Sequence, residues 1–199
     1  SVNTPLIGIA QDRLASYEPA HADELAIMMR WAFEHMQKPD GSAVWLRLST
    51  RGLEQPERGL DPAAVIAGAH WAVPPAAGAP IAIAYQGPVA PEAFAVTSPD
   101  RLHAEWLASR RGARTGRGGA PAPSHIETLL APLAPGAALV TVLDGHPAAH
   151  AWLGAVRGQR VVPLGVDRFG QAGDLPDLYR EYGLDVDAIL DACAQALIG

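Results

Sequence analysis

Residues 163–174 read PLGVDRFGQAGD, and this stretch predicts how the C-terminal part of the chain is organised. An apolar run over residues 161–166 gives way to a turn that contains Gly165 and Gly170. Asp174 is a residue type that favours a helix N-cap, and the proline soon after it suits a first helical turn. In α/β proteins, loops at the carboxyl ends of strands carry functional residues. The stretch therefore indicates either such a loop or a corner that docks a neighbouring domain.

Short apolar runs recur upstream of this corner, separated by turn residues or by helical patterns. Val, Ile and Ala dominate these runs, as in strands that are buried on both faces of a sheet. The expected strands are residues 43–48, 81–85, 94–97, 138–143 and 161–166. The expected helices are residues 19–37, 100–109, 147–156, 175–182 and 186–197. This alternation predicts an α/β fold in which helices flank a mostly parallel sheet.

A change in composition divides the chain. Between residues 60 and 80 Ala, Gly and Pro predominate, with Pro74, Pro75 and Gly78 as breakers of regular structure. We therefore expect part of a first α/β domain over residues 1–60, a linker over residues 61–80 and a second α/β domain over residues 81–199.

The link between the second and third expected strands is short. Only residues 86–93 separate Tyr85 from Phe94, whereas a parallel crossover needs roughly 10–12 residues or more. Either these two strands pair as a hairpin, or a segment of the natural chain is missing from this sequence. We favour a missing segment, with the junction near Ala93 and Phe94.

Composition limits the class of protein. The 199 residues are 49% apolar, which suffices for a packed core. A formal net charge of -6 argues against a nucleic-acid or anionic-membrane partner. No apolar run is long enough for a membrane helix, and the first residues do not resemble a signal peptide. We expect a cytoplasmic protein, and the richness in Ala, Gly, Pro and Arg is typical of a GC-rich bacterial genome.

Two histidine-containing patterns supply reactive residue types but do not form a complete site. His146 and His150 are four residues apart on an expected helix, a spacing that suits a metal, but no third ligand accompanies them. We expect two partly exposed histidines at a helix start and no metal site. Ser124, His125 and Asp144 supply hydrolase residue types, yet no G-x-S-x-G motif is present, so a catalytic triad is not expected.

Two further features have ordinary interpretations. Residues 110–119 are rich in Arg and Gly but lack interleaved aromatic residues and the Lys-Ser/Thr of a phosphate-binding loop. We expect a solvated, flexible loop there. Cys193 is the single cysteine, which excludes an intramolecular disulfide and a multi-cysteine zinc site, and we expect it to be a small core residue.

The C-terminal corner resembles a known family. LGVDRFG (residues 164–170) and LDVDAI (residues 184–189) resemble the closing segment of the transketolase C-terminal domain. The greatest resemblance is to the homodimeric E1 component of 2-oxo acid (pyruvate) dehydrogenase complexes, and Asp167, Phe169 and Gly170 form its signature turn. TSPDRL (residues 97–102) and SHI (residues 124–126) also fit that domain. SYEP (residues 16–19), DELAIM (residues 23–28) and LSTR (residues 48–51) resemble the second half of the pyrimidine-binding domain.

The resemblance implies thiamine diphosphate and magnesium bound in a homodimeric oxidoreductase. In such enzymes a glutamate activates the cofactor, a 2-oxo acid loses carbon dioxide, and the acyl group passes to a lipoyl group on an E2 acyltransferase. This chain lacks the family's G-D-G…N motif for magnesium and diphosphate, and the activating glutamate is expected upstream of Ser1. We therefore expect the C-terminal third of a larger enzyme, inactive alone, with no catalytic, cofactor-binding or metal-binding residue assigned in it.

The loop after the strand at residues 43–48 falls where E1 enzymes place a substrate-facing loop. The resemblance thus makes Arg47, Arg51 and Glu54 the substrate-facing candidates. The two arginines suit a substrate carboxylate, although solvated arginines at a subunit rim would give the same pattern. Some E1 enzymes have a histidine near the position of Glu54, so the identity of the 2-oxo acid stays open.

Two alternatives stay open beside the E1 interpretation. A transketolase, which transfers a ketol unit between sugar phosphates, would need a His/Arg cluster for the phosphate, and the sequence shows none. A non-catalytic module that supports dimerisation and a neighbouring active site is the alternative from another class.

Overall fold

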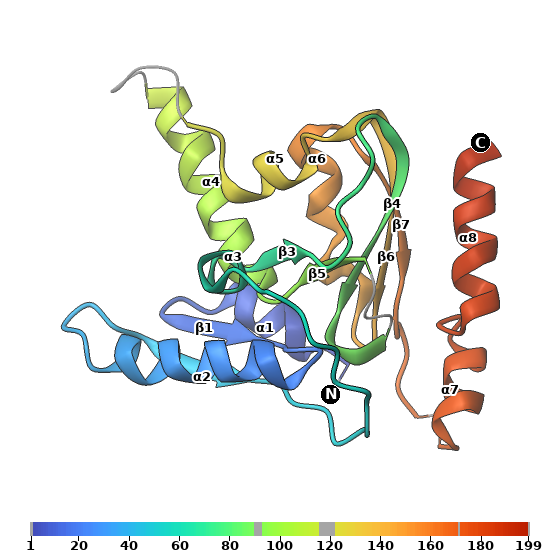
Figure 1. The fold of residues 1–199 in the computed structure, drawn as a ribbon, viewed down its shortest axis with the longest axis horizontal. Coiled ribbons are helices and arrows are strands. Elements are labelled where there is room, and N and C mark those ends of the chain that lie inside the picture. The colour runs from blue at the N-terminus through green and yellow to red at the C-terminus, as the bar shows by residue number, and fades with distance from the viewer. Residues whose placement is uncertain (1, 90–92, 116–121, 171, 199) are drawn as a thin grey trace.

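The structure is a computed structural model, and it describes residues 2–89, 93–115, 122–170 and 172–198. Two sheets flanked by helices confirm the predicted α/β class (Figure 1). The larger sheet has five strands in the order β3-β5-β4-β6-β7. They are β3 (Ala69–Trp71), β4 (Ala79–Gln86), β5 (Phe94–Val96), β6 (Leu133–Leu143) and β7 (Arg160–Leu164). β3 pairs antiparallel with β5, and the other neighbouring strands pair parallel.

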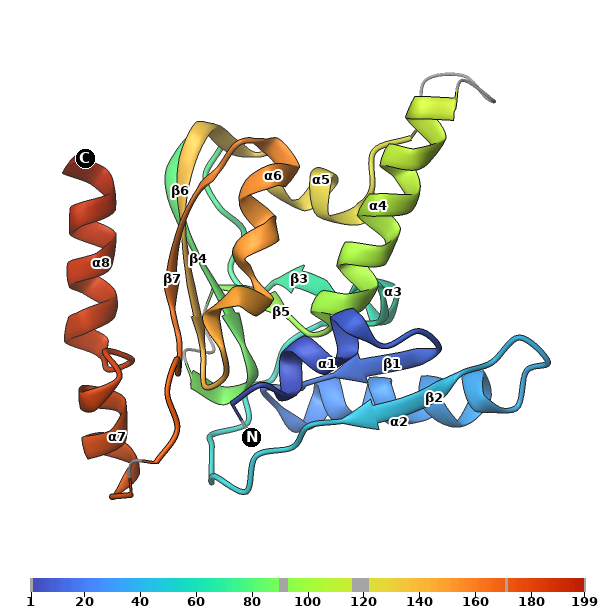
Figure 2. The same ribbon diagram turned by 180° about the vertical axis from the view of Figure 1, so that it is seen from behind.

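Helices cover both faces of this sheet (Figures 1 and 2). One face carries α4 (Pro99–Thr115), α5 (His125–Leu130) and α6 (Gly154–Arg157), together with the 3-10 segments η2 (Pro147–Ala149) and η3 (Ala151–Leu153). The other face carries α7 (Leu175–Glu181) and α8 (Val186–Ile198). Alternate residues of β4 serve the two faces: Ala82 and Ala84 join the core under α4–α6, whereas Ile81 and Ile83 pack against the core under α8. A strand that is apolar on both sides is what such a sheet requires.

The smaller sheet consists of two parallel strands, β1 (Leu14–Tyr17) and β2 (Ala43–Leu46). α2 (Ala22–Met36) packs on it through the buried Met28, and α1 (Thr4–Ala10) and α3 (Pro62–Ala67) lie beside it. The stretch 61–80, expected to link two domains, contains α3 and β3, and β3 is the edge strand of the larger sheet.

α2 differs from its prediction at its start and on its surface. It begins at Ala22 rather than near residue 19, because the Glu24 carboxylate accepts hydrogen bonds from the N–H groups of Ala20 (2.7 Å) and of the N-cap residue His21 (3.4 Å) and so closes a capping box. Its apolar face is only partly covered. The exposed apolar residues are Met29, Phe33 and Met36.

Other boundaries also differ. The helix expected over residues 147–156 is divided into η2, η3 and α6, because the chain bends there and buries His150. α4 extends to Thr115, so residues 110–115 of the expected flexible loop are helical, in keeping with the good helix propensity of Arg. Residues 116–119 of that expected loop lie outside the described residues. α1, β1, α3, β3 and α5 were not predicted.

The short link between β4 and β5 joins parallel strands. Ala84 is opposite Phe94 and Tyr85 is opposite Ala95, in parallel register, so the hairpin alternative is wrong. The two strands share only these two residue pairs, because β5 begins opposite the end of β4. The 3-10 turn η1 (Gly87–Val89) directly follows β4. The missing segment between Ala93 and Phe94 stays a prediction.

Candidate functional site

The carboxyl ends of the two parallel sheets meet at one polar seam. Glu18 and Arg47 directly follow β1 and β2, Gln86 ends β4, and Asp144 directly follows β6. His150, between η2 and η3, completes a group that we call the seam cluster. The carboxyl ends of parallel strands are where α/β proteins place functional side chains, so this seam is the candidate functional site.

Arg47 bridges two carboxylates across the seam. Its Nη1 donates hydrogen bonds to Glu18 Oε1 and to Asp144 Oδ1 (2.5 Å), and its Nη2 donates to the Asp144 carbonyl oxygen (3.1 Å). One guanidinium between two carboxylates leaves one negative charge without a partner in this trio. Burial raises the pKa of Glu18 to about 7 even with Arg47 beside it, and the charge of Asp144 adds to the rise. Glu18 can therefore hold a proton near neutral pH.

Gln86 and His150 continue the cluster into the interior of the larger sheet. Gln86 Nε2 donates to Glu18 Oε2 (2.9 Å), and Gln86 Oε1 then accepts from the Nε2–H of His150 (2.8 Å). His150 is fully buried, and burial lowers its pKa to about 4, so its ring is neutral. Its Nδ1 has no hydrogen-bond partner within the described part of the chain. The expectation of a partly exposed His150 is therefore wrong.

His146 and His150 do not share one face of a helix. His146 is the N-cap of η2, where its Nδ1 accepts from the Ala148 N–H (3.2 Å). Ser124 and His125 are likewise used locally: Ser124 Oγ bonds Glu127 (2.7 Å), and His125 Nε2 bonds the Ala69 carbonyl oxygen (2.8 Å). These side chains are occupied with capping and packing.

A second buried ionic group fixes the start of α2. Glu24 Oε1 accepts hydrogen bonds from Arg58 Nη2 (3.0 Å) and His70 Nε2 (2.9 Å), and Arg58 Nε donates to Asp23 Oδ2 (2.8 Å). Burial alone would raise the pKa of Glu24, but these hydrogen bonds lower it, so the group is a stable carboxylate. The cluster joins α2 to β3 and to the loop after β2, and it is structural in character.

The structure separates the three substrate-facing candidates. Arg47 is held in the seam cluster. Arg51 Nη1 lies 3.4 Å from Tyr179 Oη and 3.5 Å from the Pro88 carbonyl oxygen, at a cavity of about 980 Å³ beside α7 and α8. Glu54 is exposed and lines a different cavity of about 500 Å³. Their role towards a substrate stays a prediction.

The signature turn is an exposed, braced corner. Arg168 Nη2 donates to Glu181 Oε1 (2.5 Å), and the Arg168 carbonyl oxygen accepts from Tyr182 Oη (3.0 Å), so the turn is tied to α7 and its C-terminus. Phe169 is 91% exposed, and Gly170 has a φ of 115°, a conformation that favours glycine. Asp167 is exposed as well.

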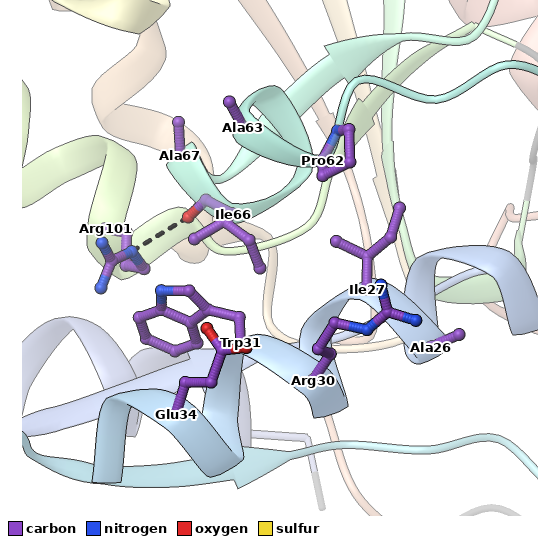
Figure 3. A pocket seen from close by; sticks show the side chains of 10 residues that line it. All are labelled: Ala26, Ile27, Arg30, Trp31, Glu34, Pro62, Ala63, Ile66, Ala67 and Arg101. Carbon is purple, nitrogen blue, oxygen red and sulfur yellow. Dashed lines mark hydrogen bonds between the residues drawn. The ribbon is translucent and has the colours of Figure 1, made fainter. Parts of the chain in front are cut away.

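An apolar hollow of about 590 Å³ lies between α2, α3 and the start of α4 (Figure 3). Arg101 crosses one side of it, where its Nε donates to the Ile66 carbonyl oxygen (3.0 Å) and its guanidinium lies 4.8 Å from the centre of the Trp31 ring. Trp31 stacks on His35, with ring centres 4.4 Å apart. The hollow is therefore suited to apolar contact rather than to proton transfer.

The residues present do not form a complete site for a metal-bound diphosphate. No group of three or more His, Cys, Asp or Glu side chains in the described ranges is arranged to hold a metal ion. The Glu18 and Asp144 carboxylates are both paired with the Arg47 guanidinium, whose positive charge would repel a metal ion placed beside them. None of the helices described has the length and apolar character to cross a bilayer.

Among the seam residues, only Arg47 was predicted as a site residue. The five positions are far apart in the sequence, and their contacts arise only because two sheets meet. The one available signal was a polar residue directly after each of three apolar runs, namely Glu18, Arg47 and Asp144. That signal indicates strand ends, but it does not show which ends come together.

Comparison with known proteins gives no matching family model and no matching curated protein. Among solved structures, the chain resembles a split-gene transketolase described as an inactive β4 tetramer, with a TM-score of 0.62 and 16% identity over 100% of this chain and 62% of that one. It also resembles two transketolase mutants from Pichia stipitis, with TM-scores of 0.63 and 0.62 and identities of 15% and 14%. These comparisons cover 99% and 100% of this chain but 27% of each Pichia chain. The chain thus has a transketolase-like fold and spans less than two thirds of each of these proteins.

Proposed function

We propose that this chain is the C-terminal portion of a thiamine-diphosphate-dependent enzyme of the 2-oxo acid dehydrogenase E1 type. The observation that carries the proposal is the superposition of 99–100% of the chain on transketolase chains that are longer than it. The resemblance of LGVDRFG at residues 164–170 to E1 enzymes supports the choice within that fold. The reaction proposed for the whole enzyme is oxidative decarboxylation of pyruvate or a related 2-oxo acid, with acyl transfer to lipoyl-E2.

Within that enzyme the residues described here have a supporting role. Thiamine diphosphate, with magnesium, supplies an electron sink for the carbanion when it is bound, and the protein supplies position and electrostatics. The residues that the structure describes offer no complete donor set for that group. Its seam cluster instead joins the two sheets. We therefore assign to this cluster the role of holding the smaller sheet in a fixed orientation relative to the larger sheet.

Transketolase is the second candidate, because each of the solved structures compared above is a transketolase. Two assays of the whole enzyme distinguish the two candidates. Pyruvate with ferricyanide as electron acceptor tests the E1 reaction, and a ketose phosphate with an aldose phosphate acceptor tests ketol transfer. We expect turnover only in the first assay. Turnover only in the second would replace E1 by transketolase.

The 199-residue chain alone tests whether it is a part of an enzyme. With thiamine diphosphate and Mg²⁺ added, we expect no decarboxylation of any 2-oxo acid, because the sequence lacks the G-D-G…N motif for magnesium and diphosphate. The matched control adds a separately expressed diphosphate-binding portion of the same enzyme, which should restore activity. Measurable turnover by the chain alone would overturn the proposal.

The gene and the native protein give an independent test. A G-D-G…N motif encoded upstream or in a neighbouring gene supports the enzyme, and its absence from both favours the non-catalytic support module. Mass spectrometry of the protein from its natural source then shows whether residues precede Ser1 and whether others lie between Ala93 and Phe94.

We also propose that the protein is a homodimer, with α2 in the interface. Met29, Phe33 and Met36 recur at helical spacing and are 40%, 61% and 43% exposed, so they form an apolar stripe on the outside of the molecule. The apolar hollow of Figure 3 lies beside this stripe, since Ile27 and Trp31 of the same helix line it. A stripe next to a hollow suits a two-fold interface, in which each copy offers both surfaces to the other.

A further inference from the structure

A groove of about 500 Å³ runs along α4, between this helix and the segment that joins α1 to β1, and we call it the α1–α4 groove. Its α4 wall extends from Asp100 to Arg111, about 16 Å of helix. Residues 8–15 form the opposite wall. Ala104 is exposed and Leu107 is half-buried, so both offer apolar surface to the groove. The groove therefore has the length and the apolar floor that suit a short helix.

Three arginines line the α1–α4 groove, namely Arg13, Arg101 and Arg111. Arg13 Nη2 donates a hydrogen bond to the Gly41 carbonyl oxygen (3.0 Å), and Arg101 Nε donates to the Ile66 carbonyl oxygen (3.0 Å). Across the ranges that the structure describes, none of the three guanidinium groups forms an ion pair with a carboxylate. Their positive charge therefore favours an anionic partner.

The other ionisable side chains of the groove do not cancel this charge. Asp100 is buried, and its carboxylate accepts a hydrogen bond from the Ser16 N–H (3.0 Å). Asp12 is exposed and accepts from the Arg13 N–H (3.0 Å). Burial lowers the pKa of His103, which keeps its ring neutral near pH 7. Three cations thus line the groove beside two carboxylates, of which one is buried, so positive charge is in excess.

The exposed face of α8 has the complementary character. Val186, Leu190 and Leu197 are 70%, 59% and 55% exposed, and their spacing of four and seven residues places them on one side of the helix, where they form the α8 stripe. Asp187 and Asp191 are exposed next to this stripe, and α8 contains no basic residue. A free helix face that is both aliphatic and acidic matches a groove with an apolar floor and three arginines.

α8 cannot occupy the groove of its own chain. It covers one face of the larger sheet, whereas α4 lies on the opposite face with α1 packed against it (Figures 1 and 2). The two surfaces therefore meet only when a second copy of the chain is present. Because the groove and α8 are different surfaces, their contact is heterologous, and a pair of copies still offers one free groove and one free helix to further copies.

We propose that α8 of a second copy lies in the α1–α4 groove, with the α8 stripe on Ala104 and Leu107 and with Asp187 and Asp191 next to the groove arginines. The charges orient the helix and speed its association, and the apolar contact excludes water between the two helices. This contact uses neither α2 nor the seam cluster. It is therefore independent of the homodimer and of the reaction proposed above.

Reversal of the charges on the two surfaces tests this contact. The groove variant carries Ala104→Glu and Arg111→Glu, and the helix variant carries Asp187→Lys and Asp191→Lys. All four side chains are exposed, so both variants should fold, which circular dichroism checks. Every sample also carries Phe33→Asp, so that the interface proposed for α2 is weakened equally throughout.

Sedimentation velocity measures the association. The Phe33→Asp chain should form species of more than two copies as its concentration rises, and about 0.5 M NaCl should weaken them, because salt screens exposed charges. The groove variant and the helix variant should each associate at least about tenfold more weakly. An equimolar mixture of the two should recover association, since each helix then meets a groove of opposite charge.

Arg110→Glu is the matched control, because Arg110 is exposed on α4 but does not line the groove. It should associate as the Phe33→Asp chain does. Undiminished association of the groove and helix variants overturns the proposal, and so does a mixture that associates no better than its two components. A Phe33→Asp chain that stays monomeric at every concentration, or whose growth stops at two copies, overturns it as well.

Discussion

Glu18 and His150 respond to the same environment in opposite ways. Burial disfavours the charged form of each, so it raises the pKa of Glu18 to about 7 and lowers the pKa of His150 to about 4. Gln86 lies between them, and its amide oxygen needs the Nε2–H of His150 as donor, so the neutral ring carries its proton on Nε2. The amide nitrogen then points at Glu18. The orientation of one amide therefore fixes the tautomer of the histidine.

These shifts have opposite effects on stability. Glu18 has a folded pKa above its ordinary value of 4.5, so its contribution is complete below pH 4.5 and is lost as the pH rises through about 7. His150 has a folded pKa below its ordinary value of 6.5, so its contribution is lost as the pH falls from 6.5 towards about 4. Each contribution is on the order of 3 kcal/mol, and the two oppose one another between these limits.

Glu18→Gln should therefore reveal the histidine contribution. Urea unfolding between pH 4.5 and 7.5 should show a free energy of unfolding that rises with pH in the variant, by about 2–3 kcal/mol, and is flatter in the starting chain. Asp144→Asn, which removes the more exposed carboxylate of the seam, is the comparison. Burial still raises the pKa of Glu18 in this variant and only the smaller contribution of the Asp144 charge is lost, so its pH profile should stay closer to that of the starting chain. Identical pH profiles for Glu18→Gln and the starting chain would show that Glu18 is not protonated near neutral pH.

At the level of elements, Gly68 ends α3 and allows β3 to follow at once. Its φ is 112°, and a Cβ at this position would lie 2.5 Å from the Ser98 carbonyl oxygen. The Gly68 carbonyl oxygen also accepts hydrogen bonds from the N–H groups of Thr97 (2.8 Å) and Ser98 (3.0 Å), which hold the end of β5 in place. A residue with a side chain meets both an unfavourable φ and a backbone clash.

Gly68→Ala should lower the free energy of unfolding by more than about 2 kcal/mol. Gly136→Ala is the matched control, because Gly136 has a φ of 71° but no atom within 4 Å of its would-be Cβ. It should cost only about 1 kcal/mol for the left-handed conformation. Chemical denaturation of the two variants measures the difference, and equal losses would mean that the close approach to Ser98 is not limiting.

Element prediction from sequence succeeded where apolar runs were long. β4, β6 and β7 contain such runs, and α2 and α8 repeat apolar residues over several turns. α1, α3 and α5 have only six or seven residues each, too few for a helical period to be recognised. The seam cluster was missed for a different reason, since its contacts join residues up to 97 positions apart. The sequence predicted β2, β4 and β6 but not β1, and tertiary packing decided which of their ends meet.

At the scale of the molecule, the smaller sheet cannot be an independent unit. Two parallel strands with a few flanking helices bury little apolar surface, and parallel sheets are found almost only where both faces are covered. Here α2 covers one side, α4 contacts β1, and Arg47 and Glu18 bond to residues of the larger sheet. The apolar stripe on α2 is a part of this unit that no described element covers.

The homodimer proposed above predicts the behaviour of that stripe. Phe33→Asp places a carboxylate at the centre of the stripe, where an interface would exclude water. An unpaired charge at the core of an interface costs about 2 kcal/mol or more, so the dissociation constant of the dimer should rise at least about 30-fold. Phe169→Asp is the control, because Phe169 is also exposed but lies at the distant corner before α7. Sedimentation equilibrium over a range of protein concentrations measures both. Because Phe33 is 61% exposed in the single chain, the substitution should leave the fold intact, so any loss of association reports on the interface itself. A chain that is monomeric throughout, or a Phe33→Asp variant that associates as well as the Phe169→Asp variant, would remove α2 from the interface.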